Sequence, residues 1–368
     1  MPTELRIVNP LQQNFSCDNC GFCCSNWKVK VDPEKVSELK ATEAFRTLEK
    51  SGYLPLRVLG EDTAMAMRPD GFCPFHDGRG CSIHREKGLQ AKPTVCQMFP
   101  FSLVNSPDGY YLSLSFSCPS VLKGKGRPVS EQMESLQKAV SASSFFANSP
   151  MDSESHVALT SKRAISWQQY LAVEQGLLAN LDRNNPTLSL LDAVLMLVEH
   201  PTDRIDWSQV RPSSELKEQT SRLFPFYFAY TVASLENSNS PEAVERYCGG
   251  LLEGKTLSSN LLPGRDLPEF QLYRPTDDTT KGLIERYIQN LILGKQLLSG
   301  GPFVARLLML SVSVAVLLFY LQARTNGGSK APVHDDQVWC FHLVETCIVS
   351  HTEVLTSLFA HFESELSS

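Results

Sequence analysis

The residues with the clearest capacity for chemistry are eight cysteines in the first third of the chain. Four of them lie in one short run, positions 17–24, with the sequence CDNCGFCC. Two cysteines separated by two residues let one tight turn direct both sulfurs at the same centre, and Gly21 supplies the positive φ that such a turn often needs. We therefore predict a metal or cluster site, whose candidate ligands are Cys17, Cys20, Cys23, Cys24, Cys73, Cys81, Cys96 and Cys118.

The adjacent pair Cys23-Cys24 constrains this site. Neighbouring side chains diverge along most backbones, so we do not expect both sulfurs to reach one small ion. One of the pair would then serve a second centre, join a larger cluster or support the first ligands. The alternatives are buried free thiols, which the regular spacing disfavours, and a disulfide framework, which requires an oxidising compartment.

Composition and charge exclude several classes of function. The chain has 368 residues, enough for two domains, and its net charge of -6 offers no basic surface to nucleic acid or to an anionic membrane. Residues 1–6 lack a basic segment followed by an apolar one, so no secretory signal is visible and we expect a cytoplasmic protein. In a reducing compartment the odd total of 11 cysteines favours thiolate ligands, and we expect core thiols at Cys248, Cys340 and Cys347.

The segment Leu307–Gln322 is almost uninterrupted apolar sequence between two arginines. It is a candidate membrane span by composition. However, its apolar run is about sixteen residues, shorter than the roughly twenty that a bilayer requires, and Ser311 and Ser313 interrupt it. We therefore favour a central helix buried by its neighbours and expect no membrane.

The cysteines are expected on a small α/β framework. Alternating residues from Trp27 to Asp32 predict a short strand, and Asp32-Pro33-Glu34 predicts an N-cap and first turn of a helix that extends toward Phe45. One or two further strands are expected between Leu54 and Arg68.

The second cysteine group surrounds a Gly-rich turn at positions 77–80, which should fold Cys73 back toward Cys81 as in a hairpin. A β-rich run at positions 110–116 then leads to Cys118. Proline follows both Cys73 and Cys118, as at iron-sulfur ligands, where it stiffens the chain that leaves the metal. His76 and His84 are also candidate ligands, but we favour packed or supporting imidazoles for both.

Five ordered motifs between residue 14 and about residue 120 resemble a known family. They are FSCDNCGFCC, NWKVKVD, CSIHREKG, CQMFP and LSFSCP. These motifs are similar to the cysteine-cluster family of zinc- or iron-chelating proteins, and within it to the flagellin lysine N-methylase branch. The resemblance implies that the eight cysteines hold metal and that the chain is a protein-lysine N-methyltransferase using S-adenosylmethionine.

Two features depart from the methylase branch. The first cysteine run is more compact here, and Phe101 stands where methylase relatives tend to have arginine. The compact first run brings the chain closer to the smaller cluster-only proteins.

Residues 123–165 are rich in Ser, Gly, Lys and Pro and are predicted as a linker with an embedded helix near positions 131–140. Helical periodicity dominates from Ser166 onward. The predicted helices are 166–181, 187–199, 214–235, one that starts at Ser240-Pro241, 281–298, 302–323 and 335–362.

The segment Gly249–Thr256 fits the phosphate-loop pattern G-x4-G-K-[ST]. A phosphate loop leaves a buried strand and opens a helix, whereas here a helix precedes the pattern and a poor helix start follows it. We therefore interpret Gly249-Gly250 as a helix C-terminus and do not expect nucleotide binding.

We predict an α+β protein, with a small Cys-rich metal-binding α/β domain at 1–122, the linker, and a mainly α-helical domain at 166–368. The first functional hypothesis is a cytoplasmic metalloprotein with an iron-sulfur cluster (4Fe-4S) or zinc, whose helical half binds a protein substrate or partner. The second is a non-enzymatic structural metal domain that tethers a helical interaction domain. Eight thiols divide evenly into two closed four-ligand sites, which favours the second.

Overall fold

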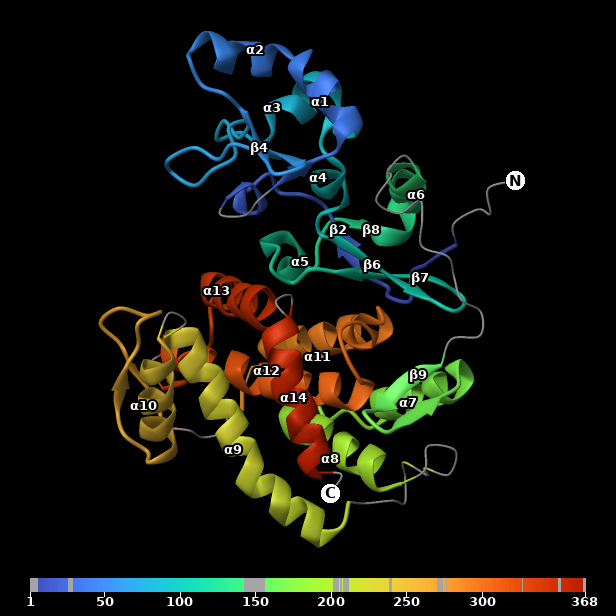
Figure 1. Cartoon of the computed structure of the whole chain (residues 1–368), viewed down its shortest axis with the longest axis vertical. Helices are drawn as coiled ribbons and strands as arrows, with labels where there is room; N and C mark the ends of the chain where they lie inside the picture. The colour runs from blue at the N-terminus through green and yellow to red at the C-terminus, as the bar shows by residue number, and fades with distance from the viewer. Residues whose placement is uncertain are drawn as a thin grey trace. The chain divides into compact units, whose positions relative to one another are not determined.

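A computed structural model shows an α+β chain that divides into two compact units, residues 1–151 and 152–368 (Figure 1). The division falls inside the stretch that was predicted as a linker. The structure describes residues 6–25, 29–141, 156–200, 205, 207, 212–237, 240–269, 274–275, 277–325, 327–349 and 352–366. Trp27, part of the predicted linker and the first residues of the chain lie outside that description.

The first unit contains a three-stranded antiparallel sheet of order β3-β5-β4, built from β3 (Lys30–Val31), β5 (Asp62–Met65) and β4 (Leu56–Leu59). Both strands expected between positions 54 and 68 are therefore present. Two helices, α1 (Pro33–Lys40) and α2 (Glu43–Lys50), pack near this sheet and bury Leu39 and Phe45.

The helix predicted from Asp32 toward Phe45 is in fact these two helices. Thr42 accepts a hydrogen bond from the Phe45 amide, which caps a new helix and ends the continuous pattern. Asp32 occupies the N-cap position of α1, but its carboxylate instead accepts a 2.7 Å bond from the Thr94 amide. The predicted cap therefore ties α1 to a cysteine segment 62 residues away.

A second sheet joins β1 (Ile7–Val8), β7 (Gly109–Leu114) and β6 (Phe101–Ser106), with β1 parallel to β7 and β6 antiparallel to it. All six residues of β7 are buried. A separate antiparallel pair of short strands, β2 (Asn14–Phe15) and β8 (Arg127–Pro128), joins the N-terminal and C-terminal parts of the unit. The embedded helix predicted near 131–140 is α6 (Met133–Ser141).

The second unit is mainly helical. Its helices are α7 (Trp167–Ala179), α8 (Pro186–Glu199), α9 (Ser214–Glu236), α10 (Pro241–Leu252), α11 (Asp278–Leu293), α12 (Phe303–Arg324), α13 (His334–Val344) and α14 (Thr352–Leu366). Two short hairpins accompany them, β9 (Val157–Thr160) with β10 (Arg163–Ile165), and β11 (Leu257–Ser258) with β12 (Asp266–Leu267). Four of these helices are capped by a side chain that accepts a hydrogen bond from a backbone amide of the first turn. The capping residues are Ser166, Ser213, Ser240 and Asp277.

Helix α12 is the core of this unit, with α8, α9, α13 and α14 packed around it (Figure 1). It spans 22 residues with a mean hydropathy of 2.2 in its most apolar window, so by length and composition alone it could cross a membrane. That window is 100% buried inside the protein. The prediction of a buried central helix agrees with this packing.

Two predictions for the C-terminal helices are corrected. The helix expected at 335–362 is interrupted by a π-helical turn, Glu345–Val349, which separates α13 from α14. Because this turn directs Glu345 and Ile348 inward, Cys347 is exposed and is not the core thiol we predicted. Cys248 and Cys340 are buried as expected.

The phosphate-loop pattern does not have the context of a nucleotide site. Gly249 and Gly250 belong to the last turns of α10, and the chain leaves the helix through Gly254 at a φ of +69°. No strand leads into the pattern within the described residues 240–269. The prediction of a helix C-terminus here is confirmed.

A buried ion pair links two segments of the helical unit. The Lys295 ammonium lies 2.5–2.6 Å from both carboxylate oxygens of Glu174, and the side chains are only 1% and 8% exposed. Tyr170 donates a further bond to Glu174, and the rings of Trp167 and Tyr170 lie within 5.5 Å of the ammonium. Removal of one partner would leave the other charge buried without compensation.

We predict that Lys295→Met lowers the free energy of unfolding of the helical unit by about 3–5 kcal/mol. The double variant Lys295→Met/Glu174→Leu should lose much less, because no charge then remains buried. Urea unfolding measures both values, and Arg222→Met, which breaks the exposed Arg222–Glu218 pair, should cost under about 1 kcal/mol. Equal losses for Lys295→Met and Arg222→Met would contradict the prediction.

Candidate metal centre

The first cysteine run forms a tight knuckle. Asn19 and Gly21 both have positive φ, 53° and 76°, and a short 3-10 turn at Phe22–Cys24 follows. The Cys24 amide donates to the Gly21 carbonyl at 2.8 Å, and the Asn19 amide donates to the Cys17 sulfur at 3.4 Å. Amides that face a sulfur favour its thiolate form, so this turn has the local geometry of a metal knuckle.

The second cysteine segment is bonded to the first. The Cys73 amide donates to the Cys24 carbonyl at 2.6 Å, and Ser25 pairs with Phe72 in an antiparallel bridge. Backbone hydrogen bonds therefore hold these two segments side by side. They lie 48 residues apart in the sequence, counted from Ser25 to Cys73.

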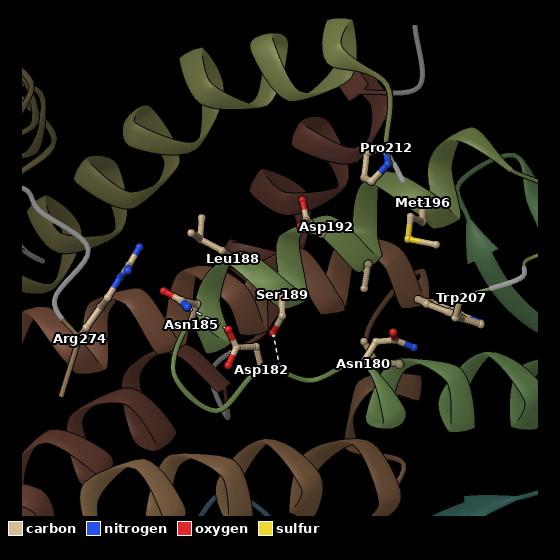
Figure 2. A pocket seen from close by; sticks show the side chains of 12 residues that line it. Asn180, Asp182, Asn185, Leu188, Ser189, Asp192, Met196, Trp207, Pro212 and Arg274 are labelled. Atoms are coloured by element: carbon tan, nitrogen blue, oxygen red, sulfur yellow. Dashed lines mark hydrogen bonds between the residues drawn. The ribbon is translucent and has the colours of Figure 1, made fainter. Parts of the chain in front are cut away.

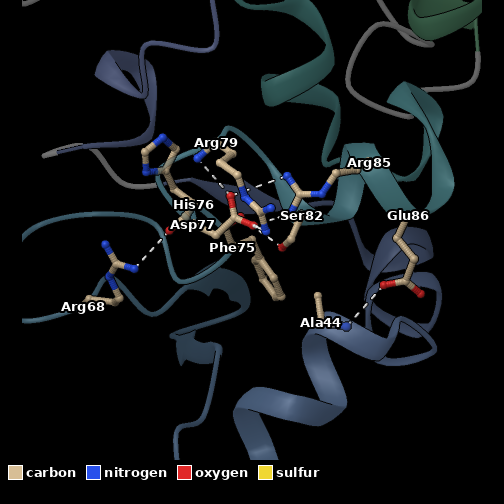
Figure 3. Close-up of polar contacts among 9 residues, drawn as sticks. All are labelled: Ala44, Arg68, Phe75, His76, Asp77, Arg79, Ser82, Arg85 and Glu86. Atoms are coloured by element: carbon tan, nitrogen blue, oxygen red, sulfur yellow. Dashed lines mark hydrogen bonds and ion pairs between the residues drawn. The ribbon is translucent and has the colours of Figure 1, made fainter.

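The Gly-rich turn folds the chain back as expected. His76 pairs with Cys81 in an antiparallel bridge, and the Ser82 amide and hydroxyl both donate to the Phe75 carbonyl. Asp77, the first residue of this turn, forms an ion pair with Arg85, which Figure 3 shows on the side away from the His76 ring. Cys73 and Cys81 are thereby brought to the same end of the loop.

Short helices position the remaining cysteines. Cys81 directly precedes α3 (Ser82–Lys87), Cys96 lies within α4 (Thr94–Met98), and Cys118 directly precedes α5 (Pro119–Lys123). The Cys118 sulfur accepts hydrogen bonds from the backbone amides of Ser120 and Val121. Pro119 occupies the first position of α5, and the Val121 amide also donates to the Cys118 carbonyl at 3.0 Å.

The candidate thiols act on one another electrostatically. Cys96 interacts with Cys73, Cys81 and Cys23, whereas Cys118 interacts with Cys23 and Cys20. Cys17 also interacts with Cys20 and Cys23. Cys23 therefore interacts with thiols of two groups. Seven of the candidate cysteines, Cys23 included, belong to this set, because each of the others interacts either with Cys23 or with a thiol that does.

The tandem cysteines do not diverge as we expected. The Cys23 thiol forms a side-chain hydrogen bond with Cys24, so the two sulfurs lie together. The 3-10 turn that contains both residues has a tighter backbone than a strand, in which neighbouring side chains would point to opposite faces. This pair links the two groups of thiols: one comprises Cys17, Cys20 and Cys118, and the other comprises Cys73, Cys81 and Cys96.

The second group packs against the hydrophobic core of the unit, beside residues such as Phe45, Met65 and Phe75. Burial raises the pKa of the Cys73 thiol to about 11 and that of Cys118 to about 12. Burial also raises the pKa of Cys96 well above its usual range. Without a metal these thiols are therefore protonated at neutral pH.

Lys92 is a residue of this site that the sequence analysis missed. Its positive charge lowers the pKa of Cys17, Cys23, Cys73 and Cys96, which opposes the effect of burial. It stands four residues before Cys96, so a lysine close to a cysteine was the available signal. A cation here would stabilise a site that holds several thiolates.

The two candidate histidines differ in their surroundings. His84 is an exposed residue of α3. Partial burial of its ring, together with the Lys92 charge, lowers its pKa. His76 is buried at 9% exposure, stacks on Phe72 and has an Nε2 atom without a hydrogen-bond partner. The structure therefore places His76, and not His84, against the cysteine knuckle, where a Cβ at Gly21 would lie 2.4 Å from Nε2.

The donor set fits a soft metal, although the sulfurs do not yet surround one point. Within the described residues, which include all eight candidate cysteines, no three His, Cys, Asp or Glu side chains form the ligand set of a single ion. Thiolates favour zinc and iron, and the unpartnered Nε2 of His76 is a buried polar atom that needs a partner. Thiol-rich chemistry and this orphaned nitrogen agree with a metal centre at the knuckle.

A cavity of about 360 Å³ lies in the helical unit, between the start of α8 and the end of α7 (Figure 2). Its wall carries Asp182 and Asp192, with Trp207 and Arg274 nearby. Asp182 already accepts bonds from Asn184 and Asn185, which hold its pKa below the usual range. The cavity therefore combines acidic and aromatic side chains.

Residues 16–119 match the family model described as "Putative zinc- or iron-chelating domain". This match covers the knuckle and every candidate cysteine. An uncharacterized protein of Methanocaldococcus jannaschii is 29% identical over 130 residues, 34% of this chain and 44% of the relative. The chain thus spans less than half of the length of that relative. No solved structure matches the chain. The comparisons support the metal-chelating domain but give no support to the flagellin methylase branch.

The raised thiol pKa values predict that metal binding is coupled to proton release. The thiols of Cys73 and Cys118 hold their protons up to about pH 11–12, so each must lose a proton when it becomes a ligand at neutral pH. We predict that zinc affinity rises as the pH increases from 6.5 to 8.5, because fewer bound protons compete with the metal. Titration against a zinc chelator at each pH measures this, and a pH-independent affinity would contradict it.

Proposed function

We propose that the N-terminal unit holds zinc or iron in thiolate centres and that its cysteine cluster is the functional site of the chain. The backbone bonds that join the knuckle to the Cys73 segment carry this proposal, and Cys23 also interacts electrostatically with Cys96 and Cys118. The candidate thiols come from four separate segments. Those segments are the knuckle, the Gly-rich loop, α4 and the start of α5. The match of residues 16–119 to a chelating domain supports the same function.

The two groups of thiols suggest two centres. Cys17, Cys20 and Cys118 would contribute three ligands to one centre, and Cys73, Cys81 and Cys96 would contribute three to the other. Cys23, which interacts with thiols of both groups, and its neighbour Cys24 would each supply the fourth ligand of one centre. Four thiolates per centre give closed sites, which stabilise a fold and do not leave a position for substrate.

The structure supports a stabilising role for the metal. The first unit has short strands and a small core, whose buried members include Val31, Leu39 and Phe45. Half-buried thiols line one side of that core, where metal bonds would add to apolar packing. Bound zinc or iron would supply strong bonds between segments that otherwise meet through single backbone contacts.

Among the metals we favour an iron-sulfur centre. Amides of Ser120 and Val121 already bond the Cys118 sulfur, and Pro119 fixes the chain that leaves it. Hydrogen bonds to sulfur and rigid exits are features of iron-sulfur ligation. A bound cluster would add one-electron chemistry, whereas zinc would not.

The proposal also assigns roles to the rest of the chain. The helical unit would contact a protein partner or substrate, and the reducing cytoplasm would keep the thiols available for metal. Lysine N-methylation with S-adenosylmethionine is the finer candidate, and the acidic and aromatic cavity of Figure 2 is the feature that favours it. An amine substrate would be held by the carboxylates of such a cavity.

Metal analysis tests the proposed centres. We predict that full-length protein purified without oxygen contains thiolate-bound metal, visible as brown colour and acid-labile sulfide for iron-sulfur or as colourless zinc. Cys96→Ser and Cys118→Ser should each lower the metal content, whereas Cys347→Ser, which changes an exposed thiol of the helical unit, should not. Equal metal content in all three variants would contradict the proposal.

Ligand-induced stabilisation tests the enzymatic candidate separately. If the helical unit binds S-adenosylmethionine, saturating donor should raise its melting temperature, because a ligand specific to the folded state stabilises that state. Asp192→Asn should reduce binding of a lysine-containing peptide by roughly tenfold if that carboxylate contacts the amine, a loss of about 1.4 kcal/mol. No shift and no peptide binding would remove this candidate and leave the metal site intact.

A further inference from the structure

His76 is the buried polar side chain of the first unit whose environment is least complete. Only 9% of the residue is exposed, and its Nε2 atom is buried without a hydrogen-bond partner. A buried polar atom left unpaired destabilises the folded state, so a stable protein normally supplies a partner.

The backbone and ring of His76 are held firmly. Its amide donates to the Cys73 carbonyl at 3.0 Å, and its own carbonyl accepts from Arg68 at 3.0 Å (Figure 3). The ring stacks on Phe72 with a centroid distance of 5.4 Å and an interplanar angle of 22°. The imidazole is therefore preorganised and does not need to move far to meet a partner.

The free nitrogen of His76 lies against the cysteine knuckle. A Cβ atom built on Gly21 would be 2.4 Å from Nε2 and 2.6 Å from Cε1, so only glycine permits this approach. Gly21 directly follows Cys20 and lies three residues before Cys24. The imidazole thus reaches the turn that presents four of the eight candidate thiols.

We propose that Nε2–H of His76 donates a hydrogen bond to a metal-bound thiolate of the 17–24 run, which makes His76 a positioning residue of the centre. This inference rests on the proposed metal-binding function. A protonated thiol is a weak hydrogen-bond acceptor, whereas a thiolate held by metal is a strong one. Nε2 would therefore gain its hydrogen-bond partner when the knuckle binds metal.

A donor role agrees better with the chain than a ligand role. In the proposed two-centre arrangement the eight thiols would supply four ligands to each centre, so no position would require an imidazole. Two four-thiolate zinc centres would carry a net charge of -2 each, which donors must offset. Lys92 supplies a positive field to thiols of both groups, and His76 would supply a directed hydrogen bond.

Two substitutions distinguish these roles in the full-length, metal-loaded protein. His76→Phe keeps a flat ring but has no donor, and His76→Gln keeps an N–H donor but is a poor metal ligand. We predict that His76→Phe retains the metal content of the unsubstituted protein and binds zinc about 10–100-fold more weakly in competition with a chelator. His76→Gln should recover most of that loss. The exposed His84→Gln is the matched control and should change nothing.

Each other outcome overturns the inference in a recognisable way. Lower metal content in both His76 variants would identify His76 as a ligand. Unchanged affinity in His76→Phe would show that its nitrogen does not contact the centre. Absence of metal from the unsubstituted protein would instead refute the proposed function, which the same metal analysis reveals before any variant is compared.

Discussion

The first unit depends on bringing thiols together beside an apolar core. Burial raises the pKa of these thiols, so in the metal-free protein they are neutral and pack as small apolar groups. Metal would replace their protons and turn the same side chains into anions. Several polar features around them, among them the amides at Cys118 and the charge of Lys92, favour that second state.

Short elements make this convergence possible. No strand of the first unit within residues 6–25 and 29–141 exceeds six residues, and each cysteine segment is fixed by a few backbone bonds to another. The Asp32 carboxylate bonds the amide that begins α4, and the Cys73 amide bonds the knuckle. Such single contacts position side chains well but stabilise weakly, which is why metal bonds would matter to this unit.

The helical unit is stabilised differently. Its central helix α12 is enclosed by other helices, and two of its buried charges have partners: Lys295 with Glu174, and Glu236 with Tyr320, Ser259 and the amides of Asn260 and Leu261. Apolar burial and paired charges both contribute to the stability of such a unit. The two units therefore obey different physical rules within one chain.

The sequence by itself determined the fold class, the caps and approximate extents of most helices, the buried nature of α12 and the identity of the candidate thiols. These features depend on local spacing: capping serines precede their helices, and the C-x2-C turn is a short-range pattern. The tertiary structure alone decided that Asp32 reaches Thr94, that the sulfurs of Cys23 and Cys24 lie together, that the His76 ring lies against Gly21 and that the charge of Lys92 acts on the thiols. Each of these depends on contacts between distant segments or on the turn type of the backbone, and residue spacing along the chain does not encode which side chains meet across such a gap.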